Sequence, residues 1–272
     1  MRKYLLLAGV VLLVATAGCL GGDSGADGEN GMDDANMTDT VTEEMLAALD
    51  DAAAHSFFMN QTVQTEAVES GTNLSLAEVR VSINRGLVDL DDNELRVNTT
   101  VQSPTNEGVN ERGKIYIVDG VEYLGRLTQN GTRWVTLTNE TVQRSLSVYS
   151  RLGILAERLQ NATVEYVRTE EVNGTEAHLL EANPSNPNDY INDIVENNSV
   201  INVEATNVSL RLWVSTETDL PVRIQETIES RTTDRRAVID QPEARSEFTT
   251  RYDAYNYTDE DISIDVPEDA QS

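Results

Sequence analysis

Residues 207–215 read Asn-Val-Ser-Leu-Arg-Leu-Trp-Val-Ser, and the order of side chains in this stretch indicates the fold class. Apolar Val208, Leu210, Leu212 and Val214 occupy every second position. Successive side chains of a β-strand point to opposite faces, so this alternation predicts a strand with one apolar and one polar face. A sheet of such strands has one face that needs a cover and one that water can wet.

The same period of two recurs along most of the chain and predicts a long β region. Turn dipeptides such as Asp119-Gly120 and Asn130-Gly131 separate successive segments at short distances, which favours an antiparallel meander. A further hairpin is expected across Asn173-Gly174. The predicted strands are 56–66, 74–84, 94–103, 112–118, 121–128, 132–137, 163–170, 175–182, 203–215, 222–230, 244–254 and 262–266.

Two shorter segments have helical features. Residues 42–55 begin with Thr42 as a candidate N-cap, followed by two glutamates in the first turn, where the helix dipole favours acidic groups. His55 comes at the end of this predicted helix, and a surface or helix-cap role is expected for it. A short helix is also expected at 187–196, after two prolines.

The segment 139–160 is predicted to be the helix that covers the sheet. Its apolar residues recur at steps of three and four, while Arg144, Arg151 and Arg158 mark the opposite, solvent-facing side. The apolar stripe is wider than a narrow helix seam requires. This width fits deep burial and also fits a lid over an apolar cavity, and the periodicity does not distinguish the two.

The charge balance restricts the partners and the environment. The chain of 272 residues has 20 Lys or Arg and 47 Asp or Glu, which gives a formal net charge of -27 and argues against a nucleic acid partner. The composition resembles that of haloarchaeal proteins, because at molar salt the Debye length falls to about 3 Å and self-repulsion is screened. The acidic clusters 89–92 and 259–261 are expected to be solvated surface rather than calcium sites.

The N-terminus has the layout of an export signal. Arg2 and Lys3 precede an apolar run at 4–14, and small residues follow up to Cys19, the single cysteine. The segment resembles a lipoprotein signal peptide, in which this cysteine becomes the lipid-modified first residue. Thr16 stands where leucine is usual in that motif, and an ordinary secretory signal is the alternative.

These features predict three regions: a signal peptide at 1–18, the lipidated cysteine with a flexible acidic tether at 19–41, and a folded domain at 42–272. No second apolar stretch approaches the roughly 20 residues that cross a bilayer. The expected membrane attachment is therefore the lipid on Cys19, at the extracytoplasmic face of the cell membrane.

Asn-x-Ser/Thr sequons are more frequent than the composition alone explains, which suggests N-glycosylation at an outer surface. Some also belong to turn dipeptides that a hairpin uses for its own reasons. The candidate glycosylation sites are Asn36, Asn60, Asn73, Asn98, Asn130, Asn139, Asn161, Asn173, Asn197, Asn207 and Asn256.

The sequence offers little for catalysis. It has only His55 and His178 as histidines, and no nucleophile elbow, glycine-rich phosphate loop, HExxH or CxxC motif. Paired carboxylates are no evidence for catalysis in so acidic a chain, because they are frequent in it by composition alone. We therefore expect no enzymatic activity, no metal site and no cofactor.

Several C-terminal stretches carry a resemblance to a known family. Residues 210–224 read Leu-Arg-Leu-Trp-Val-Ser-Thr-Glu-Thr-Asp-Leu-Pro-Val-Arg-Ile, a strand that turns through acidic and threonine residues into Leu-Pro and a returning strand. This hairpin, with the later segments 248–255 and 262–267, resembles the LolA/LolB and LppX/LprG-like lipoprotein superfamily over roughly 42–267. The resemblance implies an α+β fold: a strongly curved antiparallel half-barrel with helices over its concave face.

The resemblance also implies a function, since members of that superfamily bind acyl chains of lipids or lipoproteins between sheet and helices. We expect a lipid-anchored, monomeric protein that binds a membrane lipid or a lipoprotein acyl chain. The candidate ligand-binding residues are Leu152, Leu155, Leu210 and Leu212. The alternative is a structural or protein-interaction surface lipoprotein with a filled core and no ligand.

Overall fold

The structure is a computed structural model, and it describes residues 34–68, 75–104, 110–138, 140–149, 151–192, 201–234, 244–260 and 262–271. Contacts divide the chain into two units, Met1–Met32 and Asp33–Ser272, and all described residues belong to the second. The predicted signal peptide, Cys19 and most of the predicted tether lie outside the described residues.

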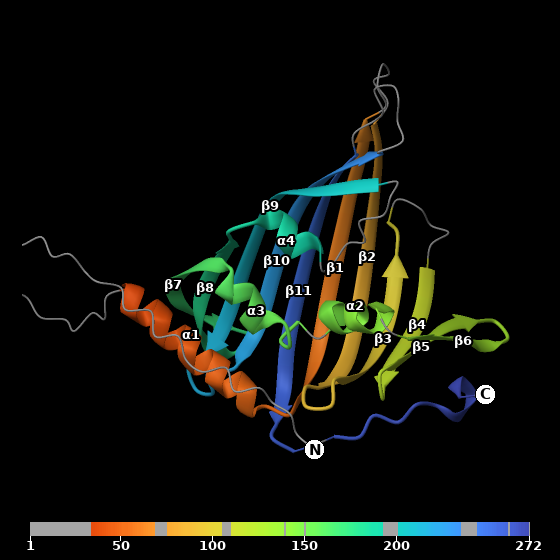
Figure 1. Cartoon of the computed structure of the whole chain (residues 1–272), viewed down its shortest axis with the longest axis horizontal. Coiled ribbons are helices and arrows are strands. Elements are labelled where there is room, and N and C mark those ends of the chain that lie inside the picture. The colour runs from red at the N-terminus through yellow and green to blue at the C-terminus, as the bar shows by residue number, and fades with distance from the viewer. Residues whose placement is uncertain are drawn as a thin grey trace, which may run out of the picture. The chain divides into compact units, whose positions relative to one another are not determined.

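The framework is one antiparallel sheet of eleven strands in the order β6-β5-β4-β3-β2-β1-β11-β10-β9-β8-β7 (Figure 1). The strands are β1 (Ala54–Val68), β2 (Ser75–Asp89), β3 (Glu94–Gln102), β4 (Asn110–Val118), β5 (Val121–Thr128), β6 (Gly131–Thr138), β7 (Ala162–Val172), β8 (Thr175–Pro184), β9 (Ile201–Ser215), β10 (Pro221–Asp234) and β11 (Ala244–Thr258). Except for the central pairing of β1 with β11, neighbours in the sheet are neighbours in sequence. The predicted fold class, an α+β fold with a strongly curved antiparallel sheet and helices over its concave face, is confirmed, and the sheet is open with few helices.

Strand register gives this sheet two different faces. Residues directly opposite each other in an antiparallel pair share a face, and Met59 of β1 lies opposite both Tyr252 of β11 and Asn84 of β2. Met59 and Tyr252 belong to the main cluster of buried side chains. We call this side the covered face and the other side the open face.

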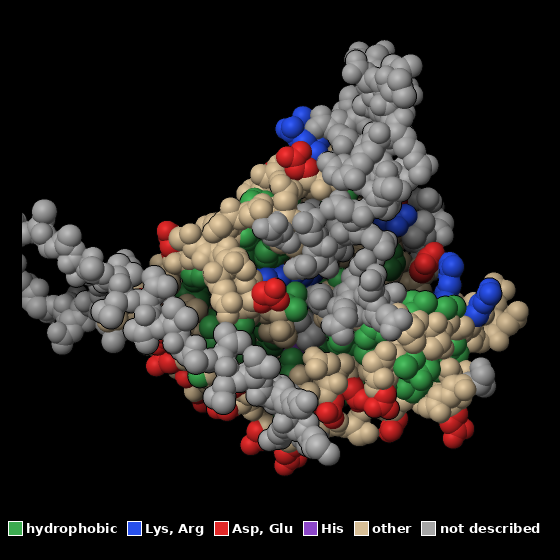
Figure 2. Space-filling model, in the orientation of Figure 1, with side chains coloured by type: hydrophobic (Ala, Val, Ile, Leu, Met, Phe, Trp, Pro, Cys, Tyr) green, Lys and Arg blue, Asp and Glu red, His purple; other side chains and the backbone are tan. Residues whose placement is uncertain are grey.

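Four helices lie over the covered face in Figure 1: α1 (Asp34–Asp51), α2 (Glu140–Tyr149), α3 (Leu155–Gln160) and α4 (Pro187–Asn192). The first three contribute buried apolar side chains to the main cluster, including Met45 of α1, Val142 of α2 and Leu155 of α3. Tyr190 of α4 packs in a separate, smaller cluster with Val208 and Ile228. Figure 2 shows this side of the molecule, with carboxylates gathered along its lower edge. The helices therefore supply the cover that the alternation of the strands requires.

The first helix differs from its prediction at both ends. It begins at Asp34, so Thr42 lies within the helix and is not its N-cap. A tertiary contact explains the earlier start, because the backbone N–H of Tyr166 in β7 donates to Thr38 Oγ1 at 2.8 Å. The helix ends at Asp51, and His55 is part of β1 rather than of a helix end.

The predicted cover helix 139–160 is two helices joined by a turn at residues 151–154. Gly153 is exposed at this turn, while Arg151 and Leu152 before it are buried. The backbone N–H of Leu155 donates to the carbonyl of Leu152 at 3.1 Å, which closes the turn. Consecutive side chains of a continuous helix point in different directions around its axis. The turn instead lets two consecutive side chains, Arg151 and Leu152, both be buried against the sheet.

The predicted last strand, 262–266, is not a strand. This segment runs outside any ladder to a short 3₁₀ helix, η1 (Glu268–Ala270). The indole Nε1 of Trp134 in β6 donates to Asp269 Oδ2 at 3.1 Å, and Ile264 is buried. The alternating apolar residues of this segment thus serve side-chain packing rather than strand pairing.

Two hairpins have the backbone that their sequences predict. Asp119 and Gly120 between β4 and β5 have φ of 52° and 72°, and Asn173 and Gly174 between β7 and β8 have φ of 53° and 85°. Positive φ at both central residues is the type I′ turn, which matches the twist of the flanking strands. The β5–β6 turn comes one residue earlier than predicted, because Gly131 is already the first residue of β6.

Candidate functional site

The layer between the covered face and the helices is the candidate site. Its four predicted ligand-binding leucines come from the α2–α3 connection (Leu152), α3 (Leu155) and β9 (Leu210 and Leu212). The structure brings all four into the main buried cluster, where none is more than 4% exposed. They therefore lie in one buried cluster, two in the cover and two on the sheet.

The sheet side of this layer is apolar over its centre. Leu212 of β9 lies opposite Ile224 of β10, and Ile224 lies opposite Tyr252 of β11. The apolar zone, as we call this part of the covered face, consists of Phe57, Met59, Val97, Ile115, Leu212, Ile224, Tyr252 and Ala254.

A row of polar side chains crosses the covered face beside the apolar zone. Register aligns Glu226 of β10 with Thr250 of β11, Thr250 with Gln61 of β1, and Gln61 with Ser82 of β2. Gln61 Nε2 donates to Thr250 Oγ1 at 3.3 Å. On β1, β10 and β11 this polar row lies two residues along the strand from the apolar zone, so a molecule with an apolar body and a polar end can contact both.

Two arginines from the cover lie above one end of the polar row. Arg151 Nη1 is 3.0 Å from Glu226 Oε2, and both side chains are only 2% exposed. Arg158 Nη1 is 3.7 Å from the same oxygen and donates to Tyr190 Oη of α4 at 2.9 Å. Burial raises the pKa of Tyr190, so this group remains a neutral phenol. We call Arg151, Arg158, Tyr190 and Glu226 the polar cluster.

The sequence-based placement of these arginines was wrong. Arg151 and Arg158 were expected on the solvent side of a continuous helix, and both are buried against the sheet. The turn after α2 changes which side of the segment faces inward. The signal that was available lies in β10, where acidic Glu226 is in phase with buried Ile224 and Ile228 and so marks a charge on the apolar face.

A second polar group under the cover is His55, which was expected near the surface. It is fully buried, its Nε2 is 2.7 Å from Tyr252 Oη, and its ring stacks on Tyr257 at 5.5 Å. Burial lowers the pKa of His55 to about 4, so the imidazole is neutral at neutral pH. These contacts make His55 a packed and hydrogen-bonded part of the core.

A third polar contact links α2 to the sheet. Ser145 Oγ donates to Glu122 Oε1 of β5 at 2.7 Å, and Glu122 is buried. Burial raises the pKa of Glu122, with the Ser145 hydrogen bond acting in the opposite direction. Burial also raises the pKa of Tyr149, at the end of α2, to about 12. Hydrogen bonding thus holds this end of the cover at a defined place on the sheet.

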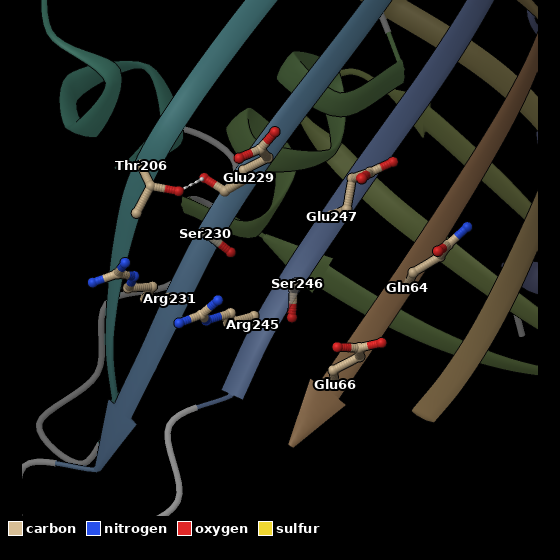
Figure 3. Close-up of a pocket in the computed structure, with 9 residues that line it drawn as sticks. All are labelled: Gln64, Glu66, Thr206, Glu229, Ser230, Arg231, Arg245, Ser246 and Glu247. Carbon is tan, nitrogen blue, oxygen red and sulfur yellow. Dashed lines mark hydrogen bonds between the residues drawn. The ribbon is translucent and has the colours of Figure 1, made fainter. Parts of the chain in front are cut away.

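The open face has a pocket of about 360 Å³ near one end of β1, β9, β10 and β11 (Figure 3). Its lining is polar, and register places like charges side by side: Arg231 opposite Arg245, and Glu229 opposite Glu247. On the other neighbour of β11, strand β1, Glu66 lies opposite Arg245. The lining residues are Gln64, Glu66, Thr206, Glu229, Ser230, Arg231, Arg245, Ser246 and Glu247.

This pocket does not suit an apolar ligand, and it lies away from the four candidate leucines. Of its cross-strand pairs, only Glu66–Arg245 joins opposite charges, whereas the like-charged pairs Arg231–Arg245 and Glu229–Glu247 oppose pairing of the strands. Throughout the described ranges, no three His, Cys, Asp or Glu side chains converge as metal ligands. Asp89 of the acidic cluster 89–92 is buried and accepts the backbone N–H groups of Asp91 and Asp92, so it caps a turn rather than facing solvent.

The candidate glycosylation sites differ in exposure. Asn60 is half-buried in β1, whereas the other described sequon asparagines are exposed. The exposed ones are Asn36, Asn98, Asn130, Asn161, Asn173, Asn207 and Asn256. Asn73, Asn139 and Asn197 lie outside the described residues.

Comparison with known proteins places the chain in a family. The profile of a family described as "Family of unknown function (DUF7537)" matches residues 4–245. A comparison with curated proteins finds no match. Among the described residues, no helix has both the length and the apolar character needed to cross a membrane.

Solved structures of lipoproteins are similar to this chain. The lipoprotein LppX from Mycobacterium tuberculosis has 10% identity and a TM-score of 0.40, with 83% of this chain and 97% of LppX covered. LprF from Mycobacterium bovis has 12% identity and a TM-score of 0.43, with 84% and 98% covered. A LolA superfamily protein from Nitrosomonas europaea has 11% identity and a TM-score of 0.22, with 83% and 96% covered. At these TM-scores, function has to be argued from the residues of this chain.

Proposed function

The chain belongs to the family of unknown function DUF7537, and we propose that it is an extracytoplasmic, lipid-anchored protein that binds a hydrophobic ligand between its sheet and its helices. The proposed ligand is a membrane lipid or the acyl chain of another lipoprotein. The proposed role is binding and not catalysis.

One observation carries this proposal: two of the three helices that pack into the main buried cluster are very short. α2 has 10 residues and α3 has 6, beside the 18 residues of α1. Isolated helices shorter than about 12 residues are marginal in water, so these helices depend on their contacts with the sheet. An acyl chain offers the apolar zone equivalent contacts at about 0.8 kcal/mol for each buried methylene. A ligand can therefore replace part of the cover without exposing the sheet to water.

The ligand is testable by direct extraction. The full chain carrying Cys19→Ser, purified without detergent, is extracted with organic solvent, and the extract is examined by mass spectrometry. We expect a bound lipid that the same purification from cells without the chain does not yield. An extract free of lipid, from a chain that also binds no added fatty acid, would overturn the proposal.

A matched pair of variants tests the location. Leu155→Trp enlarges a fully buried side chain of the cover, and Leu127→Trp enlarges an exposed side chain of β5 that is 43% accessible. We expect the first to reduce the amount of bound lipid and the second to leave it unchanged. Far-ultraviolet circular dichroism of both variants separates loss of binding from loss of folding.

The proposed anchor rests on the sequence around Cys19. A thioether-linked lipid on this residue would keep the chain in the membrane fraction, and Cys19→Ala would release it to the soluble extracytoplasmic fraction. An intact mass equal to that of the unmodified polypeptide, with the chain in the cytosol, would contradict the anchor. We also propose that the acidic composition adapts the chain to the molar salt of a haloarchaeal environment.

The structural or protein-interaction alternative has one observation in its favour. Val135 of the edge strand β6 is 50% exposed, and Leu127 of β5, which lies on the other face of the sheet, is 43% exposed. Exposed apolar residues near a sheet edge can mark a protein contact. A chain that is free of lipid but retains a protein partner, lost when Val135 is changed to Asp, would support this alternative.

A further inference from the structure

We propose that the polar cluster binds the anionic head group of an amphiphile whose apolar chain lies against the apolar zone. This inference rests on the proposed function and makes it more specific, because it names the chemical class of the ligand as a fatty acid or an anionic lipid rather than a neutral one.

The first argument is the charge balance inside the cluster. Arg151, Arg158 and Glu226 are all buried, with side chains 2%, 7% and 2% exposed. Arginine keeps its proton in proteins, so two positive charges face one carboxylate. A buried charge without a partner is costly. A second negative group at this place would remove the imbalance.

The second argument is the number of unsatisfied donors. Arg151 Nε, Arg151 Nη1 and Arg158 Nη2 are buried and make no hydrogen bond within the described structure. The carboxylate of Glu226 lies in ion-pair range of both guanidiniums, at 3.0 and 3.7 Å, but its two oxygens also make no hydrogen bond there, so Glu226 does not satisfy these donors. A carboxylate or phosphate head group supplies further oxygen acceptors, and guanidinium donors bind such groups in a bidentate manner.

The third argument is position. Glu226 begins the polar row, and Ile224, two residues before it on the same strand and the same face, belongs to the apolar zone. A head group at the arginines therefore has apolar side chains directly beside it for its chain. Thr250 and Gln61 continue the polar row away from the cluster and can take the uncharged parts of a head group.

The inference is tested with a fluorescent fatty acid, cis-parinaric acid, and its uncharged methyl ester. Both are titrated into the full Cys19→Ser chain at about pH 8, where a carboxylic acid is ionised. We expect the acid to bind about tenfold more tightly than the ester, since a charge-assisted hydrogen bond commonly has that effect. Equal affinity of the two probes would overturn the inference.

Arg158→Gln is the decisive variant because it keeps the Arg151–Glu226 pair and offers Tyr190 a new donor. It should remove the preference for the acid while leaving the affinity for the ester unchanged. Glu226→Gln should increase the preference, because one more positive charge is then unbalanced. Arg168→Gln, which removes an exposed pair with Glu170, is the control and should change neither probe.

The outcomes separate this inference from the proposed function. A chain that binds neither probe contradicts the proposed function. A chain that binds both probes equally, and equally well after Arg158→Gln, retains the proposed function and loses the head-group site. Displacement of parinaric acid by inorganic phosphate at a similar concentration would show that the site takes a free anion. This result would overturn the inference that the ligand is an amphiphile.

Discussion

At the scale of single residues, His55 makes the stability of the folded state depend on pH. Its pKa is lowered by burial from 6.5 to about 4, so only the neutral imidazole fits the folded chain. The stabilisation from the neutral form is complete above the unfolded pKa and is lost as the pH falls through the range from 6.5 toward 4.

We therefore predict that the free energy of unfolding falls by about 2 kcal/mol between about pH 7.5 and pH 5 through this group alone. His55→Gln, which keeps a side chain able to reach Tyr252, should remove this part of the pH dependence. The measurement is urea unfolding at constant salt. His178→Gln is the control, and an equal loss of pH dependence in that variant would contradict the assignment.

Gly86 in β2 is fixed by a close approach of its neighbours. A Cβ at this position would meet the ring of Phe57 and would lie 2.6 Å from the carbonyl oxygen of Arg96. Phe57 is fully buried and stacks on Tyr252 at 5.0 Å, so it has little room to move.

We predict that Gly86→Ala lowers the free energy of unfolding by about 1–3 kcal/mol, the usual effect of overpacking a core. The check is a double-mutant cycle with Phe57→Leu, which makes room for the new methyl group. The combined loss should be smaller than the sum of the two single losses. Additive losses would show that the ring of Phe57 is not the obstacle.

At the scale of elements, the β7–β8 hairpin depends on its turn. Gly174 has φ of 85°, and a residue with a Cβ pays about 1–2 kcal/mol in this region. We predict that Gly174→Ala destabilises the chain by that amount and that Gly174→Asn costs less, because asparagine tolerates the left-handed conformation. Both variants keep the Asn173 sequon, so thermal unfolding compares them directly. Equal losses would indicate an effect other than backbone conformation.

The elements also show what the sequence can predict. Alternation in β9 and β10 predicted the strands, and positive-φ dipeptides such as Asn173-Gly174 predicted their turns, because both depend on local rules. The break between α2 and α3 was missed, since it depends on how Arg151 and Leu152 meet a sheet formed by distant residues. The same holds for His55, whose burial is set by Tyr252, 197 residues further along the chain.

For the candidate site too, the parts that depend on local patterns could be predicted and the parts that depend on contacts between distant segments could not. The four leucines could be predicted to meet, because each lies on the apolar stripe of its predicted helix or strand. The polar cluster could not, because its arginines come from the cover and its acid from β10. The one available signal was the position of Glu226, which alternation places on the apolar face of β10. A buried carboxylate at that position indicates a positively charged partner from another element.

At the scale of the whole molecule, net charge governs the conditions under which the chain folds. With a formal net charge of -27, compaction brings like charges together, and the cost depends on the ionic strength. Exposed ion pairs such as Arg126–Glu111 are weakened by salt, whereas the buried Arg151–Glu226 pair is shielded from it.

We predict that the melting temperature rises with sodium chloride and that most of the rise occurs below about 1 M, because the Debye length falls from about 10 Å at 0.1 M to about 3 Å at 1 M. Beyond that concentration little repulsion remains to be screened. Sucrose, which favours compact states by exclusion without screening charge, is the control and should not reproduce the steep part of the curve. A rise that continues linearly to saturation, or one that sucrose matches, would show that solvent exclusion rather than charge repulsion limits the stability of this chain.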